Sequence, residues 1–301
     1  MKKIITLCLI AGISISVSAQ QEATPIFIGQ HYRLFNPAIS LNDSSNELLI
    51  THLSSLGSID QGPETSFLSY AREMNENVTL GIMAMRDKVF IESQTRLAAD
   101  YSYRLKLSNE NVIQLGVRAQ GGWYNVNINE LQGIPGGGVD PNLEGQGQFT
   151  FNFGFGAHYR SRVFYAGVSI PALFNSNKLE ENGIEASVRE RRQLFAVMGL
   201  NLEISNDLVL EPALMYRSMI DQTNIPSTVD MNLLFNYRDT FKVGAGYSTR
   251  ETYSILAMFY SEFLNADIGY AYEQSLQSNL LNAAKNSSQL FVNIKMKNKR
   301  Y

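Results

Sequence analysis

The chain is poor in residue types on which much protein chemistry depends. Its 301 residues include one cysteine, one tryptophan and three histidines, and only 18% are charged. The cysteine, Cys8, lies in an N-terminal segment that we expect to be removed. The mature chain is therefore predicted to hold no disulfide, cysteine metal site or cysteine nucleophile. The balance of 25 basic and 28 acidic residues shows no basic excess, which argues against a nucleic-acid partner.

Long apolar runs are also missing beyond the N-terminus, so no helix of the roughly 18 apolar residues that span a bilayer is expected. At the N-terminus, Lys2 and Lys3 precede an apolar stretch over residues 4–17, and Val17-Ser18-Ala19 resembles a cleavage site. We predict a signal peptide over residues 1–19, since the apolar stretch is short for a membrane anchor. Export without a helical anchor leaves a secreted protein or an outer-membrane barrel.

What the chain does have is alternation. From Phe149 to Tyr159, apolar and polar or small residues follow one another with a period of two, which is typical of a β-strand with one apolar face. The same pattern recurs at 97–107, 113–120, 229–238, 241–248 and 290–297. Either a soluble sandwich or a membrane barrel with its apolar face toward lipid would produce this pattern.

Three features favour the barrel. The strands are long enough to cross a bilayer when tilted. Aromatic residues gather near strand ends, as at a lipid interface. Glycines fall on the polar side of the alternation, where they allow the strands to bend tightly. We predict an all-β, transmembrane antiparallel barrel of 14 strands over residues 20–301. The expected strands are 47–56, 65–72, 77–87, 95–107, 111–126, 147–160, 162–170, 193–204, 208–218, 228–238, 241–250, 253–262, 263–274 and 287–298.

Turn lengths support this prediction. Tight turns alternate with longer connections at 57–64, 88–94, 127–146, 171–192, 219–227 and 275–286, and the short connection at 251–252 is the exception. Short periplasmic turns and long outer loops are typical of bacterial barrels. An even number of strands places both ends of the barrel in the periplasm, with residues 20–46 as a periplasmic lead-in.

Two predicted strands, 162–170 and 253–262, are apolar on both faces. Two interpretations are open. The strand pattern is misread there, or the inward face packs against a loop or a plug inside the barrel.

Little in the sequence indicates catalysis, a cofactor or a metal. His31, His52 and His158 are not brought together by any pattern, and Gly136-Gly137-Gly138 lacks the Lys-Ser/Thr that would complete a phosphate loop. The predicted lumen carries charges of both signs, which we interpret mainly as a self-neutralising interior, because a selective pore more often has a ring of one sign.

Loop 171–192 is dense in charge. It is expected to be a solvated outer loop or, alternatively, a surface that contacts a partner. The candidate contact residues are Lys178, Glu180, Glu181, Arg189, Arg191 and Arg192.

Several segments resemble the PorP/SprF family of outer-membrane barrels of the type IX secretion system. They include Phe35-Asn36-Pro37-Ala38 ahead of the first strand, Ala99–Arg104, Leu210–Tyr216 and Ile268–Glu273, in family order. Ile39-Ser40 and Ser288-Gln289 depart from the usual family pattern, so the chain resembles a divergent member.

The resemblance implies an outer-membrane location and a non-enzymatic accessory role. Members aid the export or surface attachment of particular secreted proteins, often adhesins. The implied partners are the lipid bilayer, type IX secretion components and a secreted substrate protein. Asn36, Pro37 and Ala38 are the family motif. The alternative is an outer-membrane channel for small apolar solutes.

Overall fold

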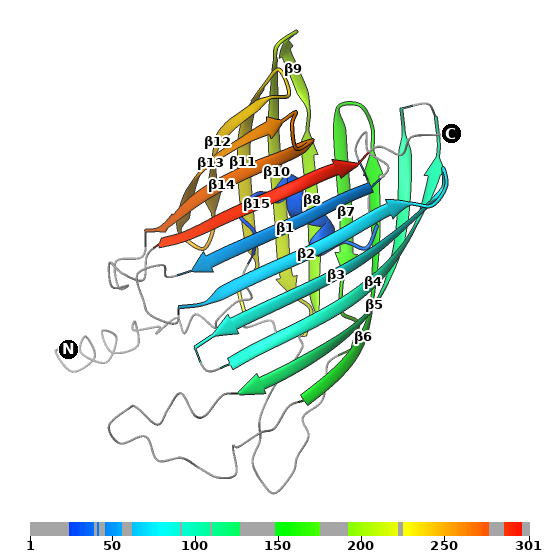
Figure 1. Ribbon diagram of the computed structural model, residues 1–301, viewed down its shortest axis with the longest axis vertical. Helices are drawn as coiled ribbons and strands as arrows, with labels where there is room; N and C mark the ends of the chain where they lie inside the picture. Colours follow the sequence, from blue (N-terminus) through cyan, green and yellow to red (C-terminus); the bar gives the residue numbers. More distant parts are fainter. Residues whose placement is uncertain are drawn as a thin grey trace, which may run out of the picture.

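The computed structural model describes residues 24–38, 41, 46–55, 62–90, 92–108, 110–126, 148–174, 192–221, 225–276 and 286–296. In these residues, fifteen strand segments form one antiparallel sheet that closes on itself as a barrel (Figure 1). No helix in this part of the chain is long and apolar enough to cross a membrane. The signal peptide lies outside the described residues and remains a prediction.

The strand bounds agree closely with the alternation. In chain order they are β1 (Asn46–Ser55), β2 (Glu64–Glu73), β3 (Val78–Val89), β4 (Glu92–Lys106), β5 (Val112–Val126), β6 (Gln148–Arg160), β7 (Phe164–Ile170), β8 (Gln193–Leu200), β9 (Leu202–Ser205), β10 (Leu208–Met219), β11 (Thr228–Tyr237), β12 (Phe241–Ser248), β13 (Thr252–Ser261), β14 (Ala266–Ser275) and β15 (Asn286–Met296).

The barrel has 14 strands because β8 and β9 are two parts of one strand, and both pair with β10. Between them, the backbone N–H of Asn201 donates to the carbonyl of Val163 at 2.8 Å. The barrel closes where β1 pairs with β15, from Asn46↔Met296 to Ser55↔Ser287. The predicted strand count is therefore confirmed.

Side chains face as the period of two requires. Phe149, Phe151, Phe153 and Phe155 on β6 are each at least 43% exposed on the outside of the barrel, where lipid replaces water. Asn152, between two of them, is 1% exposed and faces inward. The outer surface is thus apolar and the inner surface carries most of the polar groups.

The two ends of the barrel differ in their connections. Both barrel termini, Asn46 and Met296, lie at the end that carries tight turns such as 74–77 and 238–240, which we call the short-turn side. The opposite end, which we call the long-loop side, carries the connections 127–147 and 171–192. The tight joint at 251–252 is confirmed, since β12 ends at Ser248 and β13 begins at Thr252.

Some predicted boundaries were wrong. The connection at 88–94 is a tight turn, because β3 and β4 extend to Val89 and Glu92, with Phe90 at a φ of 52°. Residues 263–265 belong to a turn, not to β14, and Asn265 has a φ of 47°. Both positive φ values let the chain reverse within a few residues.

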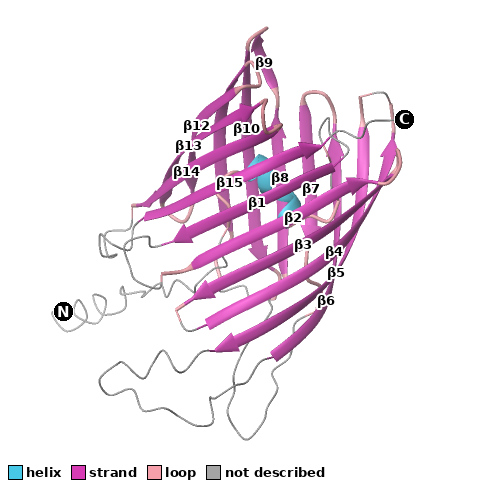
Figure 2. Cartoon of the chain, viewed as in Figure 1, coloured by secondary structure: helices cyan, strands magenta, loops and turns pink. Residues whose placement is uncertain are grey.

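The N-terminal segment differs most from expectation. We predicted residues 20–46 as a periplasmic lead-in, whereas Thr24–Ala38 lies inside the barrel (Figure 2). It contains the short helix α2 (Ile28–His31) and the 3₁₀ turn η1 (Tyr32–Leu34). We call Thr24–Ala38 the plug. It enters the lumen because its apolar side chains can be buried there, against inward-facing apolar residues of the wall.

Candidate functional site: a filled lumen and its outer pocket

The plug and the wall share a hydrophobic core. Ile26, Phe27 and Leu34 of the plug belong to one buried cluster with inward side chains of the barrel. The wall contributes Leu49, Leu53, Phe67, Met83, Met85, Ala98, Leu234, Leu256, Met258, Ala271 and Phe291. Leu256 and Met258 come from β13, one of the strands predicted to be apolar on both faces. The interpretation of packing against a plug is therefore confirmed, and the strand pattern was read correctly.

Polar groups fix the direction in which the plug runs. The backbone N–H of Ile26 donates to Oε1 of Gln289 at 2.6 Å, and that of Ile28 donates to Oδ1 of Asn232 at 2.9 Å. Further along, Arg33 pairs with Glu47 at 2.6 Å, near the start of β1. Gln289 pairs with Leu53 in the long-loop half of β1. The plug therefore runs from the long-loop half of the barrel toward the short-turn side.

His31 is held as a structural residue. Its Nδ1 lies 2.9 Å from the carbonyl of Phe27, and its Nε2 lies 2.7 Å from Oγ1 of Thr51 and 3.1 Å from Nε2 of Gln289. A carbonyl only accepts and an amide nitrogen only donates, so Nδ1 carries the proton and Nε2 accepts. These partners specify a neutral imidazole buried between the plug and the wall.

Arg118 on β5 joins the wall to the plug. Its guanidinium forms a bidentate pair with Asp100, with distances of 2.7 and 2.8 Å. It also donates to the carbonyls of Leu34 and Arg33 at 2.8 and 3.3 Å. Both charged side chains are almost completely buried. Such a pair is sensitive to the loss of either partner, because the remaining charge has no water to solvate it.

The motif residues Asn36, Pro37 and Ala38 lie in the lumen against β5 to β7. Asn36 donates from Nδ2 to the carbonyl of Ala157 at 3.1 Å and accepts the N–H of Ala38 at 2.9 Å. A Cβ at Gly116 would lie 2.2 Å from the carbonyl carbon of Pro37, and a Cβ at Gly156 would lie 2.0 Å from Oδ1 of Asn36. Only glycine lets the plug approach the wall this closely.

Charges elsewhere on the inner surface also pair with opposite charges. The ion pairs include Arg104–Glu73, Lys242–Glu211, Arg250–Asp230 and Lys295–Asp267, with distances between 2.6 and 3.2 Å. This confirms the self-neutralising interior. Of the three histidines, His158 faces inward and stacks on Tyr32 of the plug, with ring centroids 4.9 Å apart. Among the described residues no cluster of three potential metal ligands occurs.

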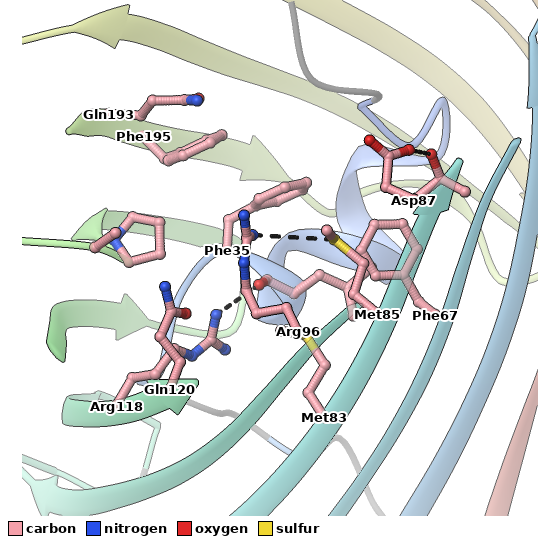
Figure 3. Close-up of a pocket in the computed structure, with 14 residues that line it drawn as sticks. Phe35, Phe67, Met83, Met85, Asp87, Arg96, Arg118, Gln120, Gln193 and Phe195 are labelled. Atoms are coloured by element: carbon pink, nitrogen blue, oxygen red, sulfur yellow. Dashed lines mark hydrogen bonds between the residues drawn. The ribbon is translucent and has the colours of Figure 1, made fainter. Parts of the chain in front are cut away.

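A pocket lies between the plug and the wall on the long-loop side, and we call it the outer pocket. Its apolar lining comes from Phe35, Phe67, Met83, Met85 and Phe195, and its polar lining includes Thr65, Asp87, Arg96, Gln120 and Gln193 (Figure 3). Leu34 and Arg118 also line it, and there the guanidinium of Arg118 donates to the carbonyl of Leu34. With a volume of about 40 Å³, it has space for a few water molecules at about 10–15 Å³ each.

The predicted partner-contact residues fall mostly beyond what the structure describes. Lys178, Glu180, Glu181, Arg189 and Arg191 lie outside the described residues. Arg192 is described and forms an ion pair with Asp221. The two ends of this loop line the outer pocket, through Pro171 and Ala172 before it and Gln193 after it.

The plug's path was not predicted from the sequence. Alternation with a period of two identifies strands. It does not predict where a 15-residue segment that pairs with no strand will lie. The available signal was an excess of inward apolar residues, such as Met83, Met85 and Leu256, which have no reason to face a water-filled channel.

Comparison with known proteins agrees with this architecture. A model of the family "Type IX secretion system membrane protein PorP/SprF" matches residues 18–294. The chain is an outer-membrane β-barrel, and it belongs to the PorP/SprF family. Family membership associates it with the type IX secretion machinery and the outer membrane. No curated protein matches the chain.

Solved structures with a similar fold are also membrane barrels. The CymD monoaromatic hydrocarbon channel is 12% identical, with a TM-score of 0.57, 90% of this chain and 94% of that chain covered. The toluene transporter TbuX of Ralstonia pickettii is 10% identical, with a TM-score of 0.54 and coverages of 94% and 97%. The toluene transporter TodX of P. putida is 10% identical, with a TM-score of 0.53 and coverages of 88% and 94%. At these identities the likeness shows the fold alone.

Proposed function

We propose that this chain is a non-enzymatic accessory barrel of type IX secretion that aids the export or surface attachment of one adhesin-like secreted protein. The observation that carries the proposal is the packed plug. A lumen filled by a shared hydrophobic core and a buried ion pair favours a barrel that stays closed. Such a barrel would serve as a rigid scaffold for its long-loop side. Partner contact then falls on the long-loop side, where loop 171–192 and the outer pocket lie.

A second candidate function is transport of small apolar solutes. It is favoured by the fold shared with hydrocarbon channels and by the apolar lining of the outer pocket. In this role the plug would have to leave or rearrange, and its hydrogen bonds to Gln289, Asn232, Thr51 and Arg118 oppose that movement.

Deleting the gene tests the proposal. We expect one secreted protein to disappear from the cell surface while other type IX substrates are still displayed, as measured by proteomics of surface-shaved cells. A shortened loop 171–192 should weaken the same display and leave a folded barrel in the outer membrane. An unchanged surface proteome together with slower uptake of an apolar nutrient would favour the transport function instead.

A further inference from the structure

The outer pocket holds an unused hydrogen-bond acceptor. Gln193 is 4% exposed, its side chain lines the pocket, and its Oε1 has no hydrogen-bond partner among the described residues. Figure 3 shows Gln193 and Phe195 extending from β8 across the pocket from the methionines of β3. A buried acceptor without a donor costs free energy, so its place beside an opening indicates a ligand that supplies an N–H or O–H.

The walls around this acceptor fit an apolar group. Phe35 of the plug stacks on Phe195 with ring centroids 4.7 Å apart, and Met83 and Met85 lie on the opposite side. Methionine side chains are flexible and polarisable, so they adapt to an inserted group of irregular shape. The resting volume of about 40 Å³ leaves room for a side chain only when these methionines move aside.

We propose that the outer pocket receives an apolar side chain from an extended segment of the secreted partner, whose backbone N–H donates to Gln193. This inference rests on the proposed function and identifies its contact site. A polypeptide carries an N–H beside every side chain, which matches the pairing of Gln193 with Met83, Met85 and Phe195. A hydrocarbon has no donor and would leave the acceptor unsatisfied. Leu34 and Arg118 also line the pocket, and their hydrogen bond joins the plug to the wall there, which fits an inserted anchor better than a solute in transit.

The location supports the same partner. Pro171, Ala172 and Gln193 line the pocket at both ends of the charge-dense loop 171–192. A segment bound with its apolar anchor in the pocket would therefore lie where the chain enters and leaves the charge-dense loop. Interfaces of this kind combine a buried apolar centre with a polar rim that selects the partner.

Two variants test the inference in cells that carry the full-length protein. Gln193→Leu removes the acceptor, and Met83→Trp fills the pocket. The matched controls are Gln274→Leu on β14, where Gln274 accepts from the hydroxyl of Tyr253, and Met198→Trp on the exposed outer face. The readouts are surface display of the protein lost in the gene deletion and the temperature at which the folded gel band disappears.

We expect Gln193→Leu to lower display about fivefold, the effect of one lost hydrogen bond, without lowering the unfolding temperature. Met83→Trp should abolish display, and both controls should display normally. If the role of Gln193 is only structural, unfolding temperature and display will fall together. Normal display in both pocket variants would overturn the inference while leaving the proposed function intact, whereas a deletion without effect on display removes both. Slower toluene uptake by Met83→Trp with normal display would assign the pocket to a small solute and overturn the peptide anchor.

Discussion

At the scale of single residues, the buried pair of Arg118 and Asp100 is expected to have a large effect on stability. Arg118→Met leaves Asp100 buried without its partner and removes both hydrogen bonds to the plug. We expect a loss of about 3–5 kcal/mol in the free energy of unfolding, measured by urea unfolding in lipid vesicles.

The matched control is Arg238→Met, which breaks an ion pair with Asp207 that is more than half exposed on both sides. Exposed pairs contribute little to stability because water screens both charges, so this variant should unfold close to the wild type. Similar losses in the two variants would show that Arg118 does not link the wall to the plug.

Some contacts between residues follow from the sequence, and others do not. The short connection between the end of β4 at Lys106 and the start of β5 at Val112 sets the register of the two strands, which places Asp100 opposite Arg118. Both residues fall on the polar side of the alternation in their strands, which is why the sequence predicts them in the lumen. Contacts such as Arg33–Glu47 and Ile26–Gln289 were not predictable, because no turn or alternation relates the plug to the strands.

At the scale of the strand, alternation predicts which side chains face lipid. This direction can be tested by placing a charge at two different depths in the membrane. Ile82 lies in the middle of β3 and is 62% exposed on the outer face, and Leu107 lies just beyond the short-turn end of β4 with 60% exposed. Ile82→Arg places a charge in the hydrocarbon and should cost about 2–4 kcal/mol, whereas Leu107→Arg should cost about 0–1 kcal/mol near the interface.

The measurement is again urea unfolding in vesicles, on protein refolded from the denatured state. A cost that is equal at the two positions would contradict the assignment of the outer face to lipid. The comparison is informative because both residues are apolar and similarly exposed in the structure, so they differ mainly in their depth.

Strands were the elements best predicted from the sequence, for a physical reason. A transmembrane strand must satisfy its backbone hydrogen bonds with its neighbours and must present opposite surfaces to lipid and lumen, which imposes the period of two. The plug has no such constraint. Its short helix α2 and turn η1 are stabilised by tertiary packing, and only the surplus of inward apolar residues on β3 and β13 indicated that something would fill the lumen.

At the scale of the whole molecule, the two candidate functions differ in whether the plug must move. Ile28 lies beside Asn232, whose Oδ1 accepts its backbone N–H at 2.9 Å. The mature chain is predicted to have no cysteine, so Ile28→Cys combined with Asn232→Cys would give one defined pair for cross-linking the plug to the wall. Each single cysteine variant serves as a control for the substitutions themselves.

We expect cells with the oxidised, cross-linked barrel to display the secreted partner as well as cells with the reduced barrel. The reason is that a scaffold binds its partner on the long-loop side, and this binding does not require the lumen to open. The measurement is surface display with and without reductant, alongside uptake of toluene as a small apolar probe. If oxidation stops toluene uptake and the reductant restores it, the plug is a gate and the barrel is a channel. If display and uptake are both indifferent to the cross-link, the filled lumen is a permanent part of the scaffold, and the partner is recognised on the long-loop side alone.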